Sequence, residues 1–170
     1  MNRFTFLSIS FLLTAVACTR QVPQLPSNKA FQVDSAAVSM QLANEKLISG
    51  EDSIIQVFVE KSSVDFEKSP SGLWYNISKL STNEDKAQHG QNCRIDYRVY
   101  SFDNLLLFNE TKNFVVGKKQ LINGLEEVFL QLSRGDSAVA VVPWYIGYGM
   151  KGNQDIPPYT SVVVRVKRIK

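Results

Sequence analysis

The chain has 170 residues, of which 44% are hydrophobic and 21% are charged. This composition suits one well-buried domain with an appendage, and it excludes a disordered chain, a collagen and a polytopic membrane protein. Lysine and arginine total 19 against 16 aspartate and glutamate, a net charge of +3, and the basic residues are scattered except near the C-terminus. We therefore expect no nucleic-acid partner.

Metal chemistry is not expected either. The chain has one histidine, His89, and two cysteines, Cys18 and Cys93, and none of them stand at the spacing of metal ligands. We expect no metal and no cofactor. The surroundings of His89 are Gln, Gly and Gln, which are typical of a solvated loop.

The first seventeen residues have the pattern of an export signal. Arg3 precedes an apolar stretch over residues 4–16 that is too short to span a bilayer comfortably. The stretch ends in Ala15-Val16-Ala17-Cys18, which resembles the lipobox of bacterial lipoproteins. The resemblance implies a signal peptide over residues 1–17 and a lipidated Cys18. The alternative is an ordinary cleaved secretory protein in which Cys18 is incidental.

The lipobox resemblance also sets the expected location. The domain would be a membrane-anchored lipoprotein of a bacterial cell envelope, facing the periplasm or the cell surface. Residues 18–35 are rich in Gln, Pro, Ser and Asn and predict a flexible tether with a span of roughly 20 to 25 Å. If Cys18 is acylated, Cys93 has no disulfide partner, and its alternation with Ile95, Tyr97 and Val99 places it in the core.

Residues 36–62 predict a helical arm. Apolar residues recur three or four apart up to Leu47, a break is expected at Gly50, and Ser49 with Asp52 predicts the capped start of a second short helix. The favoured interpretation is a helix packed back on its own domain, because the segment is short for a self-standing helical module. The alternative is an interaction arm that forms a homodimer.

After a polar run over residues 62–71, alternating patterns predict antiparallel strands. The expected strands are residues 73–77, 93–99, 105–108, 138–142 and 162–169. One helix is expected over residues 121–132, between Gly117 and Gly135. The predicted fold class is α+β, an antiparallel and strongly bent sheet wrapped around one helix, with the helical arm before it.

Familiar catalytic motifs are missing, because the chain has neither a phosphate-binding glycine loop nor a nucleophile elbow. Three ordered blocks, at residues 116–127, 132–136 and 142–149, are followed by Ile156-Pro157-Pro158. Together they resemble the FKBP-type peptidyl-prolyl isomerases, with the isomerase domain over residues 71–170. The signal peptide, the helical arm and the strand at residues 71–75 extend this resemblance to the gliding-motility-associated FKBP-type lipoproteins.

The resemblance implies an apolar bowl that binds proline. Its expected residues are Tyr97, Phe108, Asn109, Phe114, Leu121, Ile122, Leu125, Tyr148, Ile156 and Val164. Leu125 and Val164 stand where the family usually has larger aromatic residues, and Asn109 stands where it has aspartate, so a wider bowl without that charge is expected. The Tyr148 hydroxyl and the backbone N–H of Ile156 are the expected donors to the substrate. The alternative is that these side chains only form core.

The implied function is peptidyl-prolyl cis-trans isomerisation, which needs no acid, base or nucleophile. The expected substrates are proline-containing exported polypeptides, including components of a gliding or secretion machine. The alternative is a catalytically weak chaperone or scaffold that grips such partners. Beyond these polypeptides, the expected partner is a membrane, reached through the lipid anchor.

Overall fold

The computed structural model describes residues 35–80 and 85–169. The predicted signal peptide, Cys18 and nearly all of the predicted tether lie outside the described residues. The chain divides into two compact units, Met1–Val38 and Ser39–Lys170.

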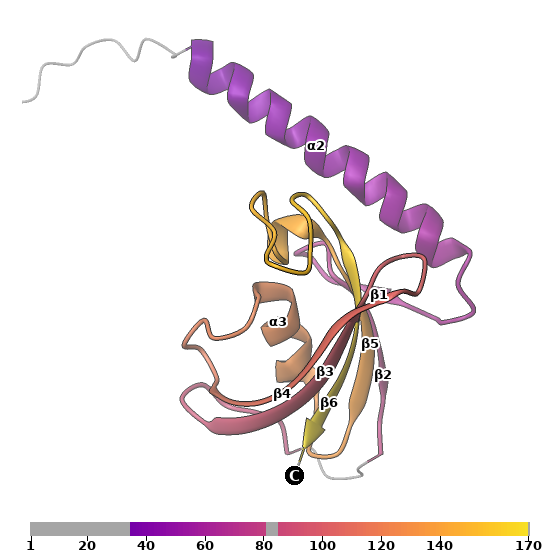
Figure 1. Ribbon diagram of the computed structural model, residues 1–170, viewed down its shortest axis with the longest axis vertical. Coiled ribbons are helices and arrows are strands. Elements are labelled where there is room, and N and C mark those ends of the chain that lie inside the picture. Colours follow the sequence, from indigo (N-terminus) through magenta and orange to yellow (C-terminus); the bar gives the residue numbers. More distant parts are fainter. Residues whose placement is uncertain (1–34, 81–84, 170) are drawn as a thin grey trace, which may run out of the picture. The chain divides into compact units, whose positions relative to one another are not determined.

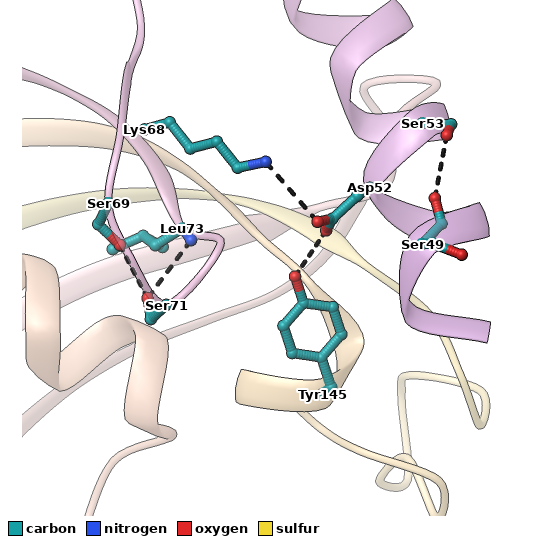
Figure 2. Close-up of polar contacts among 8 residues, drawn as sticks. All are labelled: Ser49, Asp52, Ser53, Lys68, Ser69, Ser71, Leu73 and Tyr145. Atoms are coloured by element: carbon teal, nitrogen blue, oxygen red, sulfur yellow. Dashed lines mark hydrogen bonds and ion pairs between the residues drawn. The ribbon is translucent and has the colours of Figure 1, made fainter. Parts of the chain in front are cut away.

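The helical arm is one continuous helix, α2 (Ser35–Glu60). The break predicted at Gly50 is wrong, and so is the predicted cap, because Ser49 and Asp52 both lie inside the helix. The Ser53 hydroxyl donates to the Ser49 carbonyl at 2.9 Å, four residues back along the helix (Figure 2). A lone glycine costs a helix only about 1 kcal/mol, and the good helix formers on both sides offset that cost.

The second unit contains a six-stranded sheet in which every strand pairing is antiparallel, with the order β1-β2-β5-β6-β3-β4. The strands are β1 (Glu67–Lys68), β2 (Trp74–Ser78), β3 (Asn92–Tyr100), β4 (Leu106–Val115), β5 (Ser137–Val142) and β6 (Val162–Ile169). Figure 1 shows the sheet bending around α3 (Asn123–Gln131). The predicted α+β fold is confirmed.

Two strands differ from the sequence prediction. The sheet begins at β1, inside the run that was expected to be a polar connection, because Glu67 and Lys68 pair with Tyr75 and Trp74. β4 continues to Val115, well beyond the predicted end at residue 108. Its additional residues include Asn, Glu, Thr and Lys, which an edge strand tolerates because one side of it faces water.

The core lies between α3 and the inner face of the sheet. Burial alternates along β3 and β6, and Cys93 is buried as predicted. Leu125, Val128 and Phe129 form the buried side of α3. Gly124 allows the close approach of helix and sheet, because a Cβ atom there would lie 2.6 Å from Val142 Cγ1.

The C-terminal half of α2 packs against the sheet domain, as the favoured interpretation predicted. Ile55 has no exposed surface, and the ring of Phe58 stacks on Phe102 with the centroids 4.5 Å apart. The Tyr145 hydroxyl donates to Asp52 at 2.6 Å, and Lys68 lies 3.6 Å from the same carboxylate (Figure 2). Residues 35–50 are exposed throughout.

Candidate active site

Three aromatic side chains from separate elements meet at the rim of the core. Phe108 of β4 lies between Tyr97 of β3 and Tyr148, which follows the short 3-10 helix η1 (Trp144–Ile146). The ring centroids are 6.0 Å apart for Tyr97 and Phe108 and 6.1 Å apart for Phe108 and Tyr148, and both pairs meet edge to face. Phe108 and Tyr148 are half-buried, so each ring keeps a surface that a ligand can contact.

Glu110 supplies the carboxylate next to Tyr97. The two residues are register partners in β3 and β4, so their side chains share one face, and the Tyr97 hydroxyl donates to Glu110 Oε2. Burial first and Glu110 second raise the pKa of Tyr97 well above its usual range. The hydroxyl therefore stays protonated and fixed at ordinary pH.

Asn109 does not lie among the three rings. It pairs in register with Arg98, which is exposed on the opposite face of β3 from Tyr97. Its side chain therefore shares the outer face of the sheet with Arg98. Glu110, one residue further along β4, places a carboxylate beside Tyr97.

The Tyr148 hydroxyl is available as a donor. It forms no hydrogen bond with any residue that the structure describes. No buried side-chain polar atom in those residues lacks a partner, so this unpaired hydroxyl reaches solvent. Burial of the side chain and the nearby Glu110 charge raise the pKa of Tyr148, which keeps its proton on the oxygen.

The backbone donors differ from those expected. The N–H of Ile156 already donates to Asn153 Oδ1 at 2.7 Å, so it is not free for a substrate in this conformation. The N–H of Ile122 forms no hydrogen bond within the described part of the chain. Ile122 is the extended N-cap residue of α3, where the helix dipole favours negative charge. Sequence reasoning missed this donor, although Ile122 itself was predicted in the bowl.

The remaining predicted residues are mostly buried in the core. Ile122 is half-buried, whereas the others have little or no exposed surface. These closed residues are Phe114, Leu121, Leu125, Ile156 and Val164. Phe114 meets Phe129 of α3 edge to face at 4.8 Å between centroids, which places its ring in the core.

This arrangement suits binding rather than proton transfer. The rim offers apolar rings and the Tyr148 hydroxyl, and Glu110 accepts a hydrogen bond from Tyr97 and lies 3.9 Å from Lys112 Nζ. Among the described residues no group of three or more His, Cys, Asp or Glu could hold a metal ion. His89 lies outside the core and is exposed.

The model of the FKBP-type peptidyl-prolyl cis-trans isomerases matches residues 83–167, which is half of the chain. The chain belongs to this family. The predicted family and its isomerase activity are confirmed. The likeness to the gliding-motility-associated lipoproteins stays a prediction.

Solved structures share the FKBP fold with this chain. FkpA from Escherichia coli matches with a TM-score of 0.61 and 18% identity, over 100% of this chain and 82% of that one. AtFKBP13 matches with a TM-score of 0.56 and 19% identity, over 63% of this chain and 98% of that one. The N-terminal domain of FKBP42 from Arabidopsis thaliana matches with a TM-score of 0.56 and 22% identity, over 64% of this chain and 93% of that one. At these identities the likeness shows the fold.

Proposed function

We propose that this FKBP-type isomerase acts on proline-containing segments of exported polypeptides, with Tyr148 as the principal side-chain donor. The observation on which the assignment of the site rests is the Tyr148 hydroxyl, which has no hydrogen-bond partner among the described residues, on a ring that meets Phe108. A proline ring fits the half-buried aromatic edges, and the preceding carbonyl fits the hydroxyl.

The chemistry follows from amide resonance. Rotation about an X-Pro bond crosses a barrier of about 18 to 20 kcal/mol, because the twisted amide loses its conjugation. A planar amide is more charge-separated than a twisted one, so an apolar site disfavours the planar form. The Tyr148 hydroxyl and the Ile122 N–H hold the carbonyl oxygen while the bond turns. Only contacts that are stronger in the twisted state accelerate the reaction.

The competing function is a scaffold that grips proline-containing partners with little catalysis. The two small residues, Leu125 and Val164, that replace larger aromatics in the predicted bowl are the reason to consider it. A protease-coupled proline-peptide assay separates the two functions. Catalysis that is abolished by Tyr148→Phe with Phe108→Ala supports the enzyme, whereas tight peptide binding with no change in rate supports the scaffold.

We further propose that Cys18 carries a lipid that holds the domain at a membrane of a bacterial envelope. The support is the sequence Ala15-Val16-Ala17-Cys18 after an apolar stretch. No helix in the described part of the chain is long and apolar enough to cross a membrane. Metabolic labelling with a fatty acid should mark the wild type and miss Cys18→Ser. An unlabelled wild type would contradict the anchor.

The clients we propose are parts of a gliding or secretion machine. The support is the likeness of the leader, the helical arm and the first strand to the gliding-motility-associated FKBP-type lipoproteins.

We also propose that the exposed half of α2 pairs with a second copy of the chain. Met40, Leu42 and Leu47 are exposed apolar residues there, at 69%, 60% and 50%. Light scattering should show a dimer that Met40→Glu with Leu47→Glu dissociates. A monomeric wild type would contradict it.

A further inference from the structure

The face of the sheet that is turned away from α3 carries a group of four cations, Arg94, Arg98, Arg165 and Lys167, which we call the basic face. Residues of β3 alternate between buried and outward positions, and so do those of β6. The four cations are all outward and exposed. They come from adjacent strands near the middle of the sheet, so the fold gathers charges that lie far apart in the sequence.

The register places like charges side by side. Arg98 and Arg165 are direct partners, and Lys167 pairs with Asp96 two residues further along. Like charges directly opposite each other destabilise an antiparallel pair, so the Arg98 and Arg165 pair opposes folding, whereas the Lys167 and Asp96 pair does not. An anion bound from outside would offset the repulsion.

The described residues provide one carboxylate on this face, Asp96, against four cations. None of the four cations forms an ion pair with a carboxylate in that part of the chain. The Asp96 carboxylate, their nearest candidate, accepts a hydrogen bond from the Thr111 hydroxyl at 2.7 Å on the side of β4. The Arg165 guanidinium lies over the ring of Tyr100 at 4.8 Å, which leaves its edge free to donate.

A hollow of about 280 Å³ opens between these cations. Its lining includes the hydroxyl-bearing residues Ser78 and Ser137 and the cations Arg98, Arg165 and Lys167, which outnumber the one carboxylate, Asp96. Guanidinium, ammonium and hydroxyl donors around one space match the oxygens of a phosphate group.

We propose that the basic face binds the phosphate headgroups of an anionic phospholipid bilayer. Charge complementarity favours a lipid surface over a single phosphate ion. Arg94 lies further along β3 than the hollow, so the cations form an extended surface that matches an extended anionic one. Trp74 and Tyr100 lie at the other end of the same face, with the Lys68 ammonium 5.4 Å from the Trp74 ring centroid. Such aromatic residues favour the boundary between headgroups and water. The proposal is separate from the isomerase activity.

The test measures how readily Lys167 is acetylated by a water-soluble reagent when the full chain is bound to vesicles. Lys118 is the internal control, because it belongs to the loop between β4 and α3, and this loop runs beside α3 (Figure 1). On vesicles of equal parts phosphatidylcholine and phosphatidylglycerol, Lys167 should react several-fold more slowly than on phosphatidylcholine alone. Lys118 should react equally on both. High salt should remove the protection, since it screens exposed charges.

A neutralised variant gives the matched comparison. Arg98→Gln with Arg165→Gln should lose the protection of Lys167 and keep the isomerase rate, whereas Lys118→Gln should keep both. Equal protection on phosphatidylcholine vesicles would overturn the proposal. If inorganic phosphate alone slowed the acetylation of Lys167 as much as the anionic vesicles did, the site would bind free anions instead. Protection by a polyglutamate peptide but not by vesicles would indicate an acidic polypeptide partner.

Discussion

At the scale of single residues, the position of a carboxylate depends on strand register. Glu110 shares the inner face with Tyr97, whereas Asn109 shares the outer face with Arg98. A motif alignment assigns the polar role to Asn109, because it compares order along the chain and not faces. Shifting a strand by one residue moves every side chain to the other face, so this assignment needs the observed pairing.

Substitutions of Glu110 and of Asn109 should differ in their effect on kcat/KM. Glu110→Ala leaves the Tyr97 hydroxyl without its acceptor and loosens the Tyr97 and Phe108 pair, so kcat/KM should fall several-fold to about tenfold. Glu110→Gln should lose less, since an amide oxygen still accepts. Asn109→Ala should stay within about twofold of wild type. An Asn109→Ala loss as large as that of Glu110→Ala would contradict the register argument.

The tyrosines also predict how stability changes at alkaline pH. Burial raises the pKa of Tyr97, Tyr145 and Tyr148 in the folded chain, with added effects of Glu110 and Asp52. The unfolded chain therefore releases these protons first, near the ordinary value of about 10. The free energy of unfolding should be steady below that pH and fall above it. Urea titrations from neutral pH upward measure this, and Tyr97→Phe should flatten the fall. A fall that begins well below pH 10 would argue against it.

At the scale of elements, α2 combines a docked half and an exposed half. Two neighbouring isoleucines in the docked half differ in burial, because Ile55 is 0% exposed and Ile54 is 57% exposed. Ile55→Ala should lower the free energy of unfolding by about 2 to 4 kcal/mol, and Ile54→Ala by less than about 0.5 kcal/mol. Urea unfolding followed by tryptophan fluorescence measures both. Equal losses would mean that α2 does not pack as described.

Elements with strong alternation could be predicted from the sequence, and others could not. β3 and β6 alternate apolar and polar residues, so their bounds follow closely from the pattern. β4 is polar over residues 109–113, which its place at the edge of the sheet tolerates, and no single-chain pattern reveals an edge. Gly50 has no neighbouring atom within 4 Å of an added Cβ, so it marks neither a turn nor a close contact.

At the scale of the whole molecule, the two faces of the sheet present different side chains. The inner face closes over α3 and presents the aromatic rim, and the outer face gathers the cations. Of the residues that the resemblance implied, the structure brings the rings of Tyr97, Phe108 and Tyr148 together, and their role in binding proline stays a prediction. The resemblance did not distinguish free donors from occupied ones, since the bond from the Ile156 N–H to Asn153 depends on loop geometry.

The most direct test of the account is the rate of cis-trans isomerisation of a proline peptide, measured for wild type, Tyr148→Phe and Tyr159→Phe. Tyr159 is the matched control, because the residue is 47% exposed and its ring meets Trp144 instead of Phe108. We expect wild type to accelerate the reaction, Tyr148→Phe to lower kcat/KM several-fold to about tenfold, and Tyr159→Phe to change it little. Wild-type protein without acceleration, or a Tyr148→Phe variant as fast as wild type, would contradict it.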